Sequence, residues 1–84
     1  MLVLIDDIKL DNEADFLAYI DEALPGDRIS SLTDLADYLL STDEEIELIV
    51  SDLDEAKDKS LVSSVMKIFT DASDAKQTIR LTKM

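Results

Sequence analysis

Hydrophobic residues follow strand-like patterns in three segments of the chain. Residues 2–5 form a continuous apolar run, which is typical of a strand covered on both faces. Residues 46–50 are apolar except for Glu47 and rich in branched side chains, and residues 78–83 alternate between apolar and polar positions as a half-exposed strand does. We therefore predict three strands, in these segments.

Helices are predicted between the strands, where apolar residues recur at i, i+3, i+4 and i+7. The first helix starts at Asp11 or Asn12, either of which can cap it, and runs to Leu24, just before Pro25. The third starts at Ser60, which we expect to be its N-cap. The side chains expected to face inward on these two helices are Phe16, Leu17, Ile20, Ala23 and Leu24, then Leu61, Val62, Val65, Met66, Phe69 and Ala72.

The second helix, which starts near Ser30 or Ser31, has two chemically different sides. Its apolar stripe consists of Leu32, Leu35, Ala36 and Leu39. The opposite side carries, at the same spacing, Asp34, Asp37, Tyr38 and Ser41. On spacing alone the two acids could be solvated helix residues, and the tyrosine either a contact residue or a lid over the apolar stripe.

The order of the predicted elements is strand, two helices, strand, helix, strand. Such an order implies βαβ crossovers and hence parallel strands. The chain of 84 residues, 46% of them hydrophobic, is long enough for one domain with its own core. We therefore predict a single domain over residues 1–84 with an α/β fold, a small three-stranded parallel sheet with packed helices, and leave the strand order open.

The charge of the chain is strongly acidic and unevenly distributed. Twenty acids against eight bases give a net charge of −12, and the first 42 residues hold ten of the acids but only two bases, Lys9 and Arg28. A surface this negative repels phosphate backbones, so we expect no nucleic-acid binding. The acids could simply keep a small domain soluble, or they could form a surface for a basic partner.

The residue types that are missing exclude most catalytic chemistry. The chain has no His and no Cys, so it lacks the usual nucleophilic pairs and zinc ligands, and its single Gly cannot form a phosphate-binding loop. We expect no enzyme, no cofactor and no metal. No apolar stretch approaches the roughly 20 residues of a membrane span, and no basic region precedes the first apolar run. These patterns predict a cytoplasmic protein without membrane contact.

Two strings of the sequence match the pattern of a known family. Leu24-Pro25, a short loop and the string LTDLADYL at residues 32–39 match that family's Leu-Pro, loop and Leu-x-x-Leu-x-Asp-x-Leu helix without a gap. The string SVMKIFTDA at residues 64–72 matches the family's last helix, with its Phe-x-acid-Ala end. The chain thus resembles the barstar family of ribonuclease inhibitors, and the resemblance covers nearly the whole chain. It implies a barstar-like fold and a protein that blocks the basic active site of a ribonuclease.

The resemblance also implies a binding surface. In that family the second helix and the loop before it enter the nuclease, and an Asp on the helix lies about where a substrate phosphate would lie. Asp37 matches this position, Asp71 matches an acid at the rim, and Asp27 falls where the family has a loop Tyr. The predicted partner-binding residues are therefore Asp27, Asp34, Asp37, Tyr38, Ser41 and Asp71.

The chain departs from the family at its aromatic anchors. Ala36 stands in place of a Trp, and Leu40, Ser41 and Thr42 replace a Thr-Gly-Trp run. Because binding energy concentrates in such anchors, we expect a different cognate partner, a small basic ribonuclease such as a toxin for which this chain is the immunity protein. A housekeeping inhibitor is the other reading. In either case we expect a monomer when free. The alternative function is an acidic adaptor or regulatory module that binds another basic protein.

Overall fold

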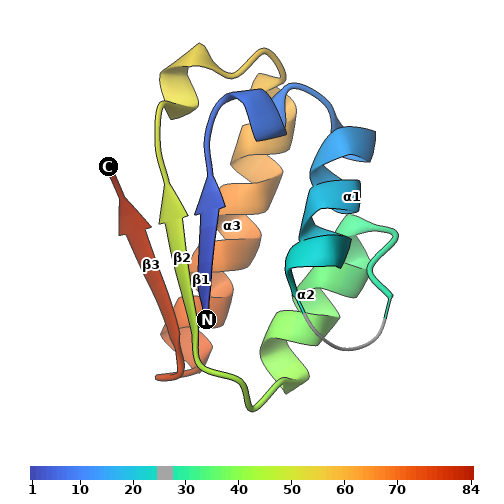
Figure 1. The fold of residues 1–84 in the computed structure, drawn as a ribbon. Helices are drawn as coiled ribbons and strands as arrows, with labels where there is room; N and C mark the ends of the chain where they lie inside the picture. The colour runs from blue at the N-terminus through green and yellow to red at the C-terminus, as the bar shows by residue number, and fades with distance from the viewer. Residues whose placement is uncertain (25–27) are drawn as a thin grey trace.

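A computed structural model describes residues 1–24 and 28–84, and in these residues three parallel strands form one sheet (Figure 1). The strands are β1 (Leu2–Ile5), β2 (Ile46–Val50) and β3 (Ile79–Lys83), with β2 in the middle. In register, Val3 lies beside Leu48, which lies beside Leu81. The predicted three-stranded parallel sheet with packed helices is confirmed, and the strand order is β1-β2-β3.

Within the same described residues, three α-helices cover one side of this sheet. They are α1 (Glu13–Ala23), α2 (Leu32–Ser41) and α3 (Lys59–Ala75), accompanied by two short 3₁₀ helices, η1 (Ile8–Leu10) and η2 (Leu53–Glu55). In Figure 1, α3 lies behind the strands, and α1 and α2 lie beside it on the right. Both crossovers between parallel strands thus return on the same side of the sheet.

The helices begin where a side chain can accept hydrogen bonds from the first turn. Asn12 caps α1, because its side-chain oxygen accepts from the Asp15 N–H at 2.8 Å. For α3 the expectation was wrong: the cap is Asp58, whose Oδ1 accepts from the Leu61 N–H at 3.0 Å, and Ser60 lies inside the first turn. The Asp58 carboxylate is the better cap here because its charge also meets the positive end of the helix dipole.

The hydrophobic core lies between the sheet and the helices. Alternate strand residues and one stripe of each helix supply it, and Phe16 of α1 and Phe69 of α3 are its largest fully buried side chains. Of the residues predicted to face inward, Ala23, Val62 and Met66 lie at the edge of the core and are half-buried. No polar or charged residue is buried in the described part of the chain.

The outer face of the sheet is uncovered, which corrects the prediction that residues 2–5 are buried on both faces. Val3 and Ile5 point into the core, whereas Leu2 and Leu4 are 56% and 52% exposed. A continuous apolar run does not show whether a second layer exists, and here both crossovers lie on the other side. We call the strand residues that face this side the open sheet face: Leu2, Leu4, Glu47, Ile49, Arg80 and Thr82, all exposed except the half-buried Ile49.

Candidate functional site

The first turn of α2 is held by reciprocal hydrogen bonds. Ser31 Oγ accepts from the Asp34 N–H at 3.1 Å, and Asp34 Oδ2 accepts from the Ser30 N–H at 3.1 Å and from Ser30 Oγ at 3.0 Å. The bonds from the Ser30 backbone and side chain hold the pKa of the Asp34 carboxyl below its ordinary value of 3.8, because they favour the ionised form. Asp34 therefore helps to hold the start of α2, whose N-cap is Ser31.

The other end and the inner side of α2 are also fixed. The Thr42 N–H donates to the Tyr38 carbonyl at 2.9 Å, and the Lys76 ammonium group at the end of α3 donates to the Thr42 carbonyl. On the inner side Leu35 and Leu39 are completely buried. The outer side of α2 is consequently a rigid surface.

A depression of about 170 Å³ lies along this outer side, and we call it the α2 depression. It brings together four of the six predicted partner-binding residues, in agreement with their helical spacing. The side chains that line it are Arg28, Ile29, Asp34, Asp37, Tyr38 and Ser41.

The other two predicted residues are not part of the α2 depression. Asp71 is exposed on α3, where its carboxylate forms an ion pair with Lys67 at 3.2 Å, one helical turn earlier. It is absent from the lining of the depression. Asp27 lies outside the described residues.

The residues that line the α2 depression differ in whether their side chains already make contacts within the protein. Asp37 is exposed, and its carboxylate has no hydrogen bond or ion pair with any residue in the described ranges. Ser41 Oγ donates to the Asp37 carbonyl at 2.7 Å, so its proton is used within the helix. Tyr38 is packed against the core and also lines the depression, so it covers part of the apolar side while remaining accessible from outside. Asp37 is thus the acid available to a partner.

Two residues near this surface were not predicted from the sequence. Arg28 lines the depression from the segment before α2, and Leu40 is 51% exposed on α2 three residues after Asp37. The sequence signal for Arg28 is a lone base directly before an acidic helix. Leu40 is signalled by its position outside the predicted apolar stripe of α2, which ends at Leu39.

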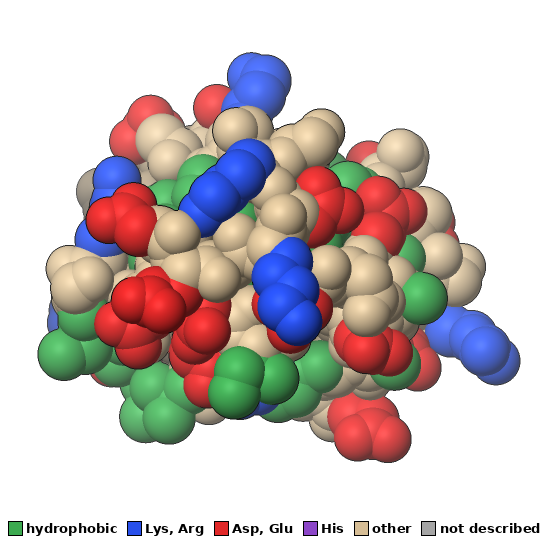
Figure 2. All heavy atoms as spheres, turned by 90° about the horizontal axis from the view of Figure 1, so that it is seen from above, with side chains coloured by type: hydrophobic (Ala, Val, Ile, Leu, Met, Phe, Trp, Pro, Cys, Tyr) green, Lys and Arg blue, Asp and Glu red, His purple; other side chains and the backbone are tan. Residues whose placement is uncertain are grey.

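Charges around the molecule are mixed but predominantly acidic. Figure 2 looks onto the end where the strands finish: acidic side chains are spread over it, with Lys and Arg between them. Hydrophobic side chains gather at the lower left of that view, on the side where the sheet lies. The described residues include no group of three acids placed to hold a metal ion. In the described ranges no helix is both long and apolar enough to cross a membrane.

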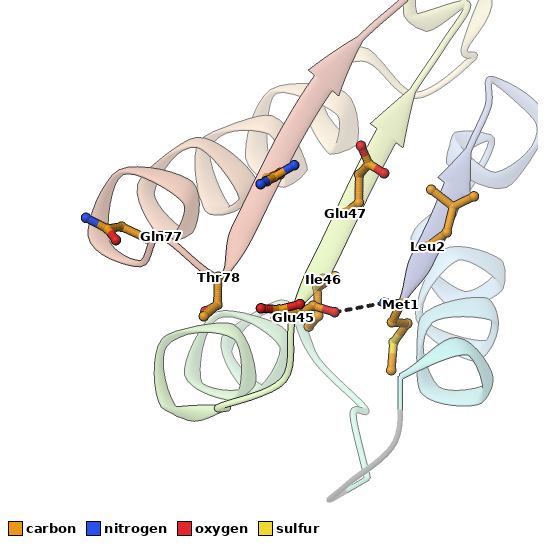
Figure 3. Close-up of a pocket in the computed structure, with 8 residues that line it drawn as sticks. Met1, Leu2, Glu45, Ile46, Glu47, Gln77 and Thr78 are labelled. Atoms are coloured by element: carbon orange, nitrogen blue, oxygen red, sulfur yellow. Dashed lines mark hydrogen bonds between the residues drawn. The ribbon is translucent and has the colours of Figure 1, made fainter.

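A larger depression, of about 510 Å³, lies at the start of the strands on the open sheet face. Figure 3 shows that its lining comes from the beginnings of all three strands, with Leu2, Glu47 and Thr78 among the residues. The buried Thr78 Oγ1 has no hydrogen-bond partner among the described residues. Its charged side chains are Glu45, just before β2, and the exposed strand residues Glu47 and Arg80, and no helix end or cap fixes them. We therefore take the smaller α2 depression as the candidate site.

No known family model matches this chain, and no curated protein matches it.

Proposed function

We propose that this protein is an inhibitor that blocks the basic active site of a ribonuclease with the outer side of α2. The observation that carries the proposal is the Asp37 carboxylate, which is exposed, has no partner among the described residues, and stands on a helix fixed at both ends. The resemblance of residues 32–39 to the barstar family assigns the same residue to the nuclease pocket.

The physical basis of such inhibition is electrostatic. A ribonuclease must present cationic groups to hold RNA and the charge that develops during cleavage, so a fixed carboxylate can occupy the place of a phosphate. A side chain on a rigid helix has little conformational entropy to lose on binding. The net charge of −12 adds long-range attraction that accelerates encounter with a basic protein.

Leu40 supports the proposal by supplying apolar contact area beside Asp37. Interfaces have a desolvated core surrounded by polar groups, and this chain lacks the aromatic anchors of the family at residues 36 and 42. Leu40 is 51% exposed and lies one helical turn from Asp37, so both side chains can enter one contact. The contact area is smaller than a Trp would give, which favours a cognate nuclease with a shallower site.

The test is the substitution Asp37→Ala. Because Asp37 is exposed and on the side opposite the core, the free energy of unfolding should change by no more than about 0.5 kcal/mol. The binding free energy should weaken by at least about 2–5 kcal/mol, because buried cations of the partner would lose their counter-charge. Inhibition of RNA cleavage is titrated against small basic ribonucleases, including barnase and any encoded beside this chain, and thermal melting checks the fold.

Asp43→Ala is the matched control, because it removes the same charge from an exposed position just after α2. It should alter neither folding nor inhibition. If Asp37→Ala inhibits as well as the parent, the phosphate-mimic proposal is wrong. If no ribonuclease is inhibited but another basic protein binds through Asp37, the adaptor function takes its place.

A further inference from the structure

Arg28 is a base placed in an otherwise acidic depression. It lines the α2 depression together with Asp34 and Asp37, and its guanidinium group forms no ion pair with any described carboxylate. Lys9, the other base of the first 42 residues, is already engaged: its ammonium group lies 3.8 Å from the Asp6 carboxylate and 4.8 Å from the ring centroid of Tyr19. Of the two bases in the first 42 residues, Arg28 is therefore the one whose charged group is available for a contact with a partner.

The backbone that follows Arg28 is firmly attached to the fold. The side chain of Ile29 is buried in the core with 3% exposure, and its N–H donates to Asp21 Oδ1 of α1 at 2.8 Å. Ser30 donates twice to Asp34, as described above. The backbone that carries the Arg28 side chain is thus held beside the start of α2.

A partner site that held only cations would be repelled by this arginine. Like charges brought together in an interface oppose binding, so a surface that only mimics phosphate should carry no base among its contact residues. The α2 depression instead offers a cation and an available anion, Arg28 and Asp37, without an ion pair between them. Its complement is a site that holds an acid beside its bases.

We propose that Arg28 determines which partner is accepted, by binding a carboxylate that stands next to the cationic groups taken by Asp37. The planar guanidinium group matches a carboxylate with two parallel hydrogen bonds, which gives geometric selectivity as well as attraction. A nuclease that uses a carboxylate as its general base beside phosphate-binding cations has this arrangement. The inference rests on the proposed function and adds the second charge of the partner's site.

The experiment compares Arg28→Gln and Arg28→Glu with the parent against the ribonuclease that the parent inhibits. Neutralisation should weaken binding by about tenfold and charge reversal by about a hundredfold, mainly through faster dissociation, because a contact inside the interface is lost. Arg28→Lys keeps the charge without the paired geometry and should lie between the parent and Arg28→Gln. Unchanged melting temperatures show that the fold is intact.

Lys83→Gln and Lys83→Glu are the matched controls, because they make the same charge changes at an exposed base at the end of β3. They should leave the dissociation rate unchanged. If Arg28→Gln binds as tightly as the parent or more tightly, the partner site holds no carboxylate there and this inference is wrong. In that case Asp37→Ala still tests the proposed function separately, and a parent that inhibits no ribonuclease refutes both.

Discussion

The outer side of α2 and the open sheet face are both exposed, but they differ in how the fold holds their side chains. The outer side of α2 presents charged groups from a helix that is capped at Ser31 and tied to Lys76 at its far end. The open sheet face presents leucines that are more than half exposed, with Glu47 and Arg80 as neighbours in register. Exposure alone therefore does not mark a site; what distinguishes α2 is an available charge held in a fixed position.

The difference follows from how each surface is made. A helix turns through its residues, so an amphipathic sequence gives a polar side whether or not anything binds there. A strand alternates, and its second side is covered only if a crossover passes over it. In this protein both crossovers cover the same side, so Leu2 and Leu4 remain outside.

The largest effect should come from the core on which both surfaces rest. Leu35 supports α2 and Leu48 supports the sheet, and both are completely buried. Leu35→Ala and Leu48→Ala should each lower the free energy of unfolding by about 2–5 kcal/mol, because a cavity is left in a closely packed core. Urea denaturation measures this. Leu40→Ala, at an exposed position of the same helix, is the control and should stay within about 0.5 kcal/mol. Destabilisation by only one core variant would mean that the two surfaces do not share one cooperative unit.

A smaller effect distinguishes the structural acid of α2 from the available one. The hydrogen bonds from Ser30 lower the pKa of Asp34 in the folded protein, so its contribution to stability is present above 3.8 and is lost as the pH falls through the lower folded value. Asp34→Asn should remove this part of the acid destabilisation and lower the melting temperature at neutral pH. The measurement is thermal melting at a series of pH values from about 2 to about 7, which spans the range in which carboxyl groups titrate.

Asp37→Asn is the comparison for this experiment, because that carboxylate makes no hydrogen bond to a described residue. It should leave the melting temperature at neutral pH as it is in the parent. An equal fall of the melting temperature in both variants would show that the reciprocal bonds at the start of α2 do not stabilise the helix.

The smallest effect should be found on the open sheet face. Leu4→Thr introduces a β-branched, strand-favouring side chain at a position that is 52% exposed, so the free energy of unfolding should change by no more than about 0.5 kcal/mol. Ribonuclease inhibition should be unchanged. The neighbouring Ile5→Val, at a position with 1% exposure, should cost about 0.5–1.5 kcal/mol. A larger loss at Leu4 than at Ile5 would show that the open sheet face is covered in solution.

Those features that depend on neighbouring residues along the chain were predictable from the sequence. The ranges Leu2–Ile5 and Ile46–Val50 are strands as predicted, because branched and apolar runs between polar segments are local signals. It was also predictable that Asp34, Asp37, Tyr38 and Ser41 lie on one surface, because helical geometry alone brings them together.

The α3 cap is a local feature that was predicted wrongly, as Ser60 instead of Asp58. Asp and Ser are both common N-cap residues, so the pattern of residue types does not choose between two candidates that lie two positions apart. The choice depends on where the packed stripe of Leu61 and Val65 fixes the helix against the core.

Only the tertiary structure decided the strand order, the uncovered side of the sheet and the contacts of single side chains. Arg28 enters the α2 depression because Ile29 is bonded to Asp21 on another helix, and Asp71 pairs within α3 instead of joining the depression. These outcomes depend on which segments meet after the chain has crossed the sheet. A periodic pattern specifies which side of an element is buried, but the neighbour that covers it, or fails to, is chosen by packing among elements far apart in the sequence.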